Sequence, residues 1–223
     1  MSLSDQNLVE LFKGLDTPGV SDAMDKLGIV GQCFGIMPLD NYREPIIGPA
    51  FTVQYVTSAQ PSGSVGDFID DVAEGDVIVI DNQGRTDCTV WGDIMTQYAG
   101  MRKIAGTVID GVCRDVSKAL SDGYPVFSRG RFMRTGKDRV QVAAVNQPVS
   151  IGQARVCDRD IVIADASGVV VVPRARAEQV AQVARQIEDV EAHIRTAISA
   201  GKTLGQAREE LGYHLLQRKD ETA

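Results

Sequence analysis

Hydrophobic positions follow two spacings along this chain, and the helical one is the easier to see. Apolar residues recur every three or four positions in several segments, which predicts amphipathic helices. The first is indicated by Leu8, Leu11, Phe12 and Leu15, and the second is expected to begin near Ser21 or Asp22 and to end near Gly28. The other helical patterns cover Asp67–Ala73, Thr86–Met101 and the long segment Ala175–Ala200, followed by a terminal helix that Thr203 and Gln206 would cap and that runs to Leu216.

Unbroken apolar runs between these segments predict buried strands, because a strand covered on both faces has no polar side. The longer runs are Ala50–Thr57, Asp76–Asp81, Thr107–Ile109 and Pro125–Phe127, and the shorter ones are Val140–Ala144, Ala154–Val156, Asp160–Ala164 and Gly168–Val172. Strands that alternate with helices predict an α/β fold. We expect residues 1–173 to form an α/β catalytic core and residues 174–223 a helical extension that packs on the core or on a neighbouring subunit.

Charged residues follow two of these strands directly. Asp81 and Asp110 each end an apolar run, so both carboxylates are expected at one edge of the sheet. Arg114 and Asp115 come next, beside the start of a helical pattern, at the edge where open α/β sheets bind ligands. A guanidinium there can hold a carboxylate or an enolate, and a carboxylate can hold Mg²⁺. The alternative is an exposed ion pair beside a turn.

Gly92 lies inside a helical pattern, where glycine costs about 1 kcal/mol relative to alanine. One explanation is that the helix begins at Gly92–Met95 and turns its free N–H groups towards an anion such as a small carboxylate. The other is a close contact between the helix and the sheet.

Composition narrows the function classes. The 223 residues are 43% hydrophobic but only 5% aromatic, so the core is expected to consist of aliphatic side chains. A formal net charge of −7 argues against nucleic acid as a partner. We expect a cytoplasmic protein with no membrane span, because the chain lacks both a long apolar run and a signal-peptide pattern. The two histidines and the missing G-x-S-x-G motif disfavour a hydrolase.

A set of motifs in this order resembles one family, over about residues 17–195. The motifs are Gly48-Pro49-Ala50-x-Thr52-Val53, Asp81-Asn82-Gln83-Gly84, Trp91-Gly92-Asp93-Ile94-Met95, Gly106-x-x-Ile109-Asp110-Gly111-x-x-Arg114-Asp115, Gly123–Phe127 and Asp165-x-x-Gly168 through Pro173. They resemble the family of regulators of ribonuclease activity A and 4-hydroxy-4-methyl-2-oxoglutarate aldolases (RraA-like). The resemblance implies a layered β/β/α sandwich of the swivelling, phosphohistidine-domain-like type with a long C-terminal helix, assembled as a homotrimer or homohexamer.

The activity that the resemblance implies is a lyase reaction. Similar enzymes are class II, divalent-metal-dependent aldolases that release pyruvate from 4-hydroxy-4-methyl-2-oxoglutarate or 4-carboxy-4-hydroxy-2-oxoadipate, and they decarboxylate oxaloacetate as a side activity. In them the backbone at Gly92, Asp93, Ile94 and Met95 binds the pyruvate carboxylate, the residue at Arg114 contacts the keto oxygen, and the one at Asp115 binds Mg²⁺ or Mn²⁺.

The chain departs from this pattern at one position and leaves one alternative open. The aldolases usually have Gly-Glu-Leu where this chain has Gly92-Asp93-Ile94, which leaves the preferred oxo-acid substrate open. Family members that only regulate ribonuclease E carry an uncharged residue at the position of Asp115, so this carboxylate favours the enzyme. The alternative is a non-catalytic regulator that binds ribonuclease E or another protein.

The chemistry itself favours a metal over a lysine. Cleavage next to a pyruvyl group leaves an enolate, which an imine or positive charge must stabilise. No lysine lies within an apolar strand, so we expect a divalent metal together with Arg114. Asp93 and Asp110 are the candidates to move the proton.

Overall fold

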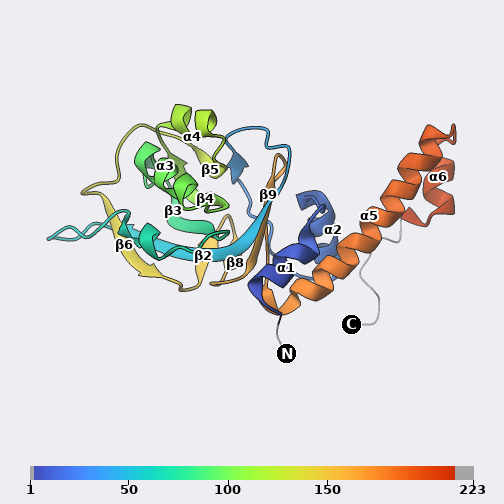
Figure 1. Cartoon of the computed structure of the whole chain (residues 1–223), viewed down its shortest axis with the longest axis horizontal. Helices are drawn as coiled ribbons and strands as arrows, with labels where there is room; N and C mark the ends of the chain where they lie inside the picture. Colours follow the sequence, from blue (N-terminus) through green and yellow to red (C-terminus); the bar gives the residue numbers. More distant parts are fainter. Residues whose placement is uncertain (1–2, 214–223) are drawn as a thin grey trace.

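Four parallel strands form the centre of the fold. The computed structural model describes residues 3–213, in which an eight-stranded sheet has the order β1-β5-β4-β3-β2-β9-β10, with β6 paired to β2. Its parallel strands are β2 (Ile46–Thr57), β3 (Val77–Thr89), β4 (Gly106–Cys113) and β5 (Val126–Arg131). The crossovers contain the 3₁₀ helix η1 (Asp67–Asp71), α3 (Asp93–Met101) and α4 (Val116–Asp122). The carboxyl ends of the four parallel strands therefore lie at one edge of the sheet (Figure 1).

Antiparallel strands extend the sheet on both sides. They are β1 (Met37–Pro38) on β5, β6 (Val140–Val145) on β2, and β9 (Ile161–Asp165), which pairs with β2 and with β10 (Gly168–Val172). A separate hairpin, β7 (Val149–Ile151) and β8 (Ala154–Val156), packs with Val79 and Val108. The helices cover the other face of the sheet. The predicted layered β/β/α sandwich with a long C-terminal helix is thereby confirmed.

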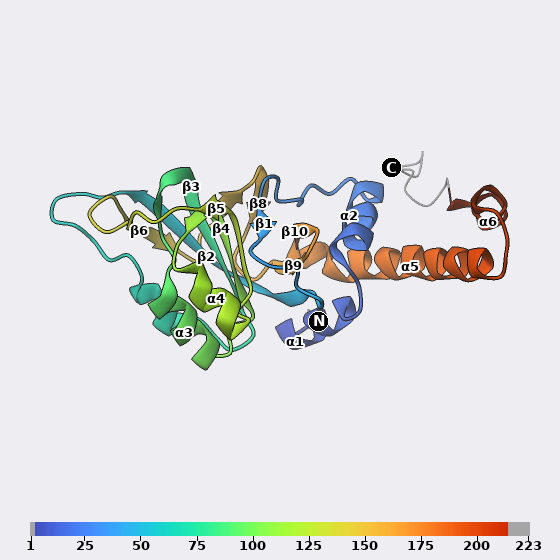
Figure 2. The ribbon, with the colours of Figure 1, turned by 90° about the horizontal axis from the view of Figure 1, so that it is seen from above.

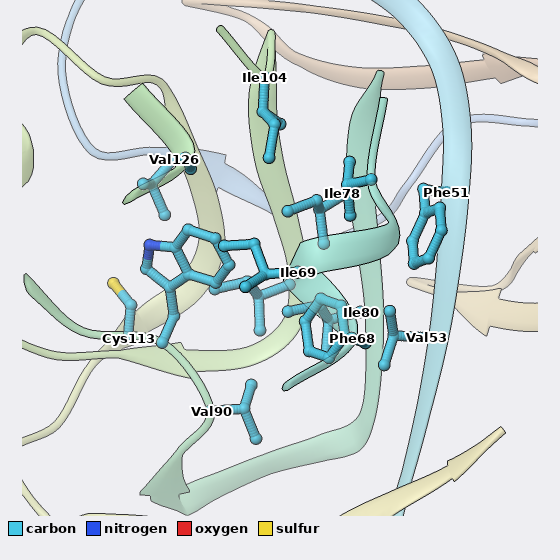
Figure 3. Close-up of a cluster of buried hydrophobic side chains, with 14 of the residues drawn as sticks. Phe51, Val53, Phe68, Ile69, Ile78, Ile80, Val90, Ile104, Cys113 and Val126 are labelled. Carbon is cyan, nitrogen blue, oxygen red and sulfur yellow. The ribbon is translucent and has the colours of Figure 1, made fainter. Parts of the chain in front are cut away.

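Aliphatic side chains fill the space between the sheet and the helices. Ile78 and Ile80 of β3 pack there against Phe68 and Ile69 of η1, as Figure 3 shows. Ile109 of β4 belongs to the same cluster, whereas its neighbour Val108 packs with the β7–β8 hairpin. Successive residues of β4 thus face opposite layers, as the pleat of a strand requires.

The terminal helices are α1 (Asp5–Phe12), α2 (Thr17–Lys26), the 3₁₀ helix η2 (Arg174–Arg176), α5 (Ala177–Ser199) and α6 (Leu204–Glu210). This group begins on β9 and β10, where α1, α2 and the first half of α5 share one hydrophobic cluster with these strands. The first half of α5 packs on α1 and α2, and Figure 2 shows its second half, with α6 beside it, extending beyond the sheet. The predicted capping box of Thr203 and Gln206 is present, but α6 ends at Glu210, with Leu211 as its C-cap, before the predicted end at Leu216, which lies outside the described residues. The division into a core and an extension stays a prediction.

Several predicted boundaries differ from the structure, and the reason is clear for two of them. Helix α2 begins at Thr17 rather than near Ser21, because Asp16 caps it and Pro18 fits its first turn. The segment from residue 86 to 89 is strand, not helix, because β3 continues past Asn82-Gln83-Gly84 and pairs Arg85 with Gly111 and Thr89 with Val112 of β4. Gln83 and Gly84 adopt positive φ values of 57° and 66°, which accommodates the irregular register at this point.

No helix between residues 3 and 213 combines the length and the apolar character needed to cross a bilayer.

Candidate active site

A cavity of about 260 Å³ lies beside the first turn of α3. The turn contributes Gly92, Asp93, Ile94 and Met95, the segment after β4 contributes Arg114, and more distant loops contribute Val65, Thr135 and Gly136. All the residues for which sequence reasoning predicts substrate contacts therefore line one cavity.

The first turn of α3 presents backbone donors. Gly92 is the N-cap, and the first intrahelical bond runs from Thr96 N to Gly92 O at 3.0 Å. The N–H groups of Asp93, Ile94 and Met95 precede that bond, so they lie at the positive end of the helix dipole. The carboxylate of Asp93 accepts one of them, from Ile94, at 2.9 Å. The explanation of Gly92 as a helix start is confirmed.

Arg114 and Asp115 lie opposite this turn. The backbone N–H of Arg114 donates to the carbonyl of Trp91 at 3.0 Å, which ties the end of β4 to the start of α3. Asp115 is the N-cap of α4 in the left-handed conformation, with φ of 54°, which aspartate tolerates better than most residues. Its Oδ2 lies 3.2 Å from Arg114 Nε and 3.5 Å from the backbone N of Asp93. Both side chains are about 40% exposed, and Arg114 lines the cavity with Asp115 beside it.

Glycine at position 92 permits the close approach of Asp115. A Cβ there would lie 2.8 Å from Oδ2 of Asp115 and 3.4 Å from Arg114 Nε. Between residues 3 and 213, the structure contains no group of three or more histidine, cysteine or acidic side chains placed to bind one metal ion together. Mg²⁺ requires only one or two carboxylates and keeps several waters. An accessible carboxylate beside a glycine fits that requirement, and Asp93 of the adjoining α3 turn is a second acid that lines the cavity.

Asp110 lies apart from this cavity. Its Oδ2 accepts from the backbone N–H of Gly152 at 2.8 Å, and its Oδ1 accepts from Arg129 Nε. The carboxylate thus faces the β7–β8 hairpin, on the side of the sheet opposite α3. Asp110 and Asp81 do pair across β3 and β4, as the sequence predicts. Burial raises the pKa of Asp81, and the charge of Asp110 adds to the shift. Asp110 therefore does not line the cavity, and we propose that its carboxylate holds the hairpin rather than moving a proton.

Replacement of Asp110 by asparagine is expected to lower stability and leave turnover intact. The amide keeps one acceptor, so either Gly152 or Arg129 loses its partner. Breaking a buried ion pair costs about 3–5 kcal/mol, and we expect about 3 kcal/mol because Arg129 is partly exposed. Urea denaturation at neutral pH measures the loss.

The matched control is Asp87→Asn, which breaks the exposed ion pair with Arg85 and should leave the urea midpoint unchanged. An Asp110→Asn protein of normal stability with no activity would return Asp110 to the catalytic site.

Sequence reasoning did not single out several residues that shape the cavity. Trp91 and Thr89 were read as parts of a helix, although Thr89 is the last residue of β3. Thr135 and Gly136 lie within the basic segment that also contains Arg134 and Lys137. Gly136 allows close packing, since a Cβ there would lie 2.4 Å from the carbonyl oxygen of Thr89. The sequence signal for this close packing was the position of Gly136 among the long basic side chains of Arg134 and Lys137.

Comparisons with known proteins identify relatives of this chain. "Protein DlpA" of Legionella pneumophila is 41% identical over 93% of this chain, which spans only 34% of that relative's length. "Putative 4-hydroxy-4-methyl-2-oxoglutarate aldolase" of Halalkalibacterium halodurans is 33% identical over 83% of this chain and 86% of the relative. The crystal structure of Streptomyces coelicolor RraAS2, described as an unusual member of the RNase ES inhibitor RraA family, superposes with a TM-score of 0.79 at 26% identity and covers 87% of this chain and all of that one.

The family model described as "RraA-like: Aldolase/RraA" matches residues 17–171, which include every residue of the candidate site. The chain belongs to the RraA-like family.

Proposed function

We propose that this chain is a divalent-metal-dependent aldolase that cleaves a 4-hydroxy-2-oxo acid and releases pyruvate. The candidate substrates are 4-hydroxy-4-methyl-2-oxoglutarate and 4-carboxy-4-hydroxy-2-oxoadipate, with oxaloacetate decarboxylation as a side activity. One observation carries the proposal: Arg114 lines the same cavity as the first turn of α3, and Asp115 Oδ2 lies 3.2 Å from Arg114 Nε and 3.5 Å from the backbone N of Asp93.

The carboxylate of the pyruvyl group binds at the first turn of α3. The N–H groups of Gly92, Asp93, Ile94 and Met95 are the donors, and the helix dipole favours an anion there. A cavity of about 260 Å³ has room for a small oxo acid. The helix backbone fixes these donors before the substrate arrives, and only the Ile94 N–H, which the Asp93 carboxylate accepts in this structure, has to change partner.

Arg114 stabilises negative charge on the keto oxygen. When the bond between C3 and C4 of the substrate breaks, its electron pair moves into the pyruvyl group, and the guanidinium offers preorganised N–H donors to that charge. Asp115 would hold Mg²⁺ or Mn²⁺, which supplies further positive charge as a Lewis acid when bound.

Asp93 is the acid that lines the cavity, and we assign proton transfer to it. It takes the proton from the C4 hydroxyl as the bond breaks, and a proton returned to C3 completes pyruvate. Aspartate is shorter by one methylene group than the glutamate usual in related aldolases. The acceptor side of the substrate is therefore where this chain is expected to differ.

Pyruvate release tests the proposal directly. Purified protein is incubated with each of the three oxo acids and Mg²⁺ or Mn²⁺, and pyruvate is measured by coupling to lactate dehydrogenase. We expect turnover that EDTA removes and added metal restores. Absence of pyruvate release with all three acids and both metals would refute the aldolase.

The second candidate function is regulation of a ribonuclease by protein contact, which the similarity to Streptomyces coelicolor RraAS2 supports. Asp115 argues against it, because a contact surface has no need of a carboxylate facing the α3 turn. Binding to ribonuclease E by a protein that releases no pyruvate would favour the regulator.

We also propose a cytoplasmic homotrimer or homohexamer. The length of α5, 23 residues or about 35 Å, supports contact with a neighbouring subunit. Ile198 and Leu204 are exposed near its far end.

A further inference from the structure

Trp91 is bonded to both halves of the candidate site. Its carbonyl oxygen accepts the backbone N–H of Arg114 at 3.0 Å, and its own chain continues directly into Gly92, the N-cap of α3. The side chain is buried, with 2% exposure, although the residue contributes to the cavity wall. A change in the position of Trp91 would therefore move the α3 donors relative to Arg114.

Thr96 connects the indole to the first turn. Its hydroxyl accepts from Trp91 Nε1 at 3.0 Å and donates to the carbonyl of Gly92 at 2.9 Å. The backbone N–H of Thr96 donates to the same carbonyl at 3.0 Å. Thr96 is itself buried, so neither bond is exchanged with solvent. One hydroxyl thus fixes the indole and the N-cap together.

Two further contacts hold the other side of Trp91. The ring stacks on Tyr124, with centroids 6.1 Å apart and planes 10° from parallel, and the Tyr124 hydroxyl lies 2.9 Å from the hydroxyl of Thr107. The backbone N–H of Trp91 donates to Thr89 Oγ1 at 3.2 Å. The indole is therefore held by α3 and by Tyr124, which is itself bonded to Thr107 of β4, and the backbone of Trp91 is held by Thr89 of β3.

We infer that Trp91 and Thr96 are positioning residues, which set the angle between the backbone donors of α3 and the guanidinium of Arg114. The inference rests on the proposed aldolase function. In this inference the rate depends on the position of the α3 donors relative to Arg114. The buried network of Trp91 and Thr96 sets that position without touching the substrate. Displacement of a reacting group by 1 Å can cost about 10²-fold in rate.

Thr96→Val tests the hydroxyl with little change in shape. We expect kcat to fall about 10-fold, with a smaller change in KM, because the donors remain but are misaligned. Thr96→Ser keeps the hydroxyl and should restore most of the rate. The matched control is Thr52→Val, which removes another buried hydroxyl, bonded to Gln147 O at 2.7 Å and away from the cavity. It should lower stability without lowering kcat.

Tryptophan fluorescence provides a second measurement. Emission and kcat should change together if the indole bond positions the site, and independently if the bond only stabilises the fold. Trp91 is the single tryptophan of the chain, so its emission reports the indole bond directly. Thr96→Val should shift the emission and lower kcat together, while Thr96→Ser and Thr52→Val should change neither. Trp91→Phe, which keeps the ring stack but loses the N–H, should match Thr96→Val in rate, and the double variant should be no slower than either single one.

The outcomes separate this inference from the proposed function. An active wild type whose Thr96→Val and Trp91→Phe variants both keep normal kcat would overturn the positioning role alone. Equal losses of rate in Thr52→Val and Thr96→Val would also overturn it, since the effect would then follow stability. A wild type that releases no pyruvate overturns the proposed function and this inference with it.

Discussion

Asp115→Asn is expected to abolish the metal dependence of pyruvate release and to lower kcat/KM by about 10²–10³-fold, because the amide cannot supply the charged oxygen that a hard cation requires. Asparagine suits this position otherwise, since it adopts the left-handed conformation observed at φ of 54° as readily as aspartate. The loss is therefore chemical rather than structural. Steady-state rates against Mg²⁺ concentration measure it, and Mn²⁺ binding followed by electron paramagnetic resonance measures the site without turnover.

The control for this charge change lies on the same helix. Asp122→Asn, at the other end of α4, breaks an ion pair with Lys118 of 2.9 Å and removes one negative charge outside the cavity. It should keep both the rate and the Mn²⁺ affinity of the wild type. If Asp115→Asn binds Mn²⁺ normally and keeps its metal-stimulated activity, the metal is held elsewhere.

Local patterns predicted the parallel core of this fold but not all of its boundaries. The apolar runs of β2, β3 and β4 could be recognised because a strand that is buried on both faces consists mostly of hydrophobic residues. Asn82-Gln83-Gly84 has a composition typical of turns, whereas the chain passes through it as a bulge and stays paired with β4. The start of α2 depends on Thr17, whose N–H and hydroxyl donate to Asp165 at 2.8 and 2.7 Å. The sequence pattern could not reveal this contact across 148 residues, whereas Asp16 and Pro18 are local signals of the same helix start.

The candidate site was predictable to the extent that it follows from topology. Neighbouring parallel strands deliver their carboxyl ends to one edge, so the meeting of Arg114 with Gly92–Met95 could be expected from their places after β4 and β3. Topology could not predict which side of the sheet the Asp110 carboxylate faces. That side depends on the β7–β8 hairpin, whose Gly152 N–H binds this carboxylate from the opposite layer. The spacing in the sequence indicates that a side chain lies at the edge of the sheet. The packing of distant segments determines towards which face of the sheet it points.

Arg114→Ala is expected to lower kcat by about 10²–10³-fold and to change KM much less, because the guanidinium acts on charge that develops as the bond breaks. Binding of the pyruvyl carboxylate remains with the backbone of α3, which this substitution does not touch. Arg114→Lys should recover only part of the rate, since an ammonium lacks the planar fork of donors. Rates at saturating and limiting substrate separate kcat from KM.

Chemical rescue distinguishes lost charge from lost structure at this position. Guanidinium ion added at millimolar concentration should raise turnover of Arg114→Ala, because the truncated side chain leaves space beside Asp115 Oδ2, which lies 3.2 Å from Arg114 Nε. The same addition should leave Asp115→Asn inactive, because that variant lacks the metal ligand rather than the guanidinium. Lys103→Ala, which removes a positive charge from an exposed pair with Glu74 just beyond α3, should keep the wild-type rate and show no rescue. Normal turnover in Arg114→Ala would show that the charge on the keto oxygen is stabilised by other groups, and the proposed role of Arg114 would have to be abandoned.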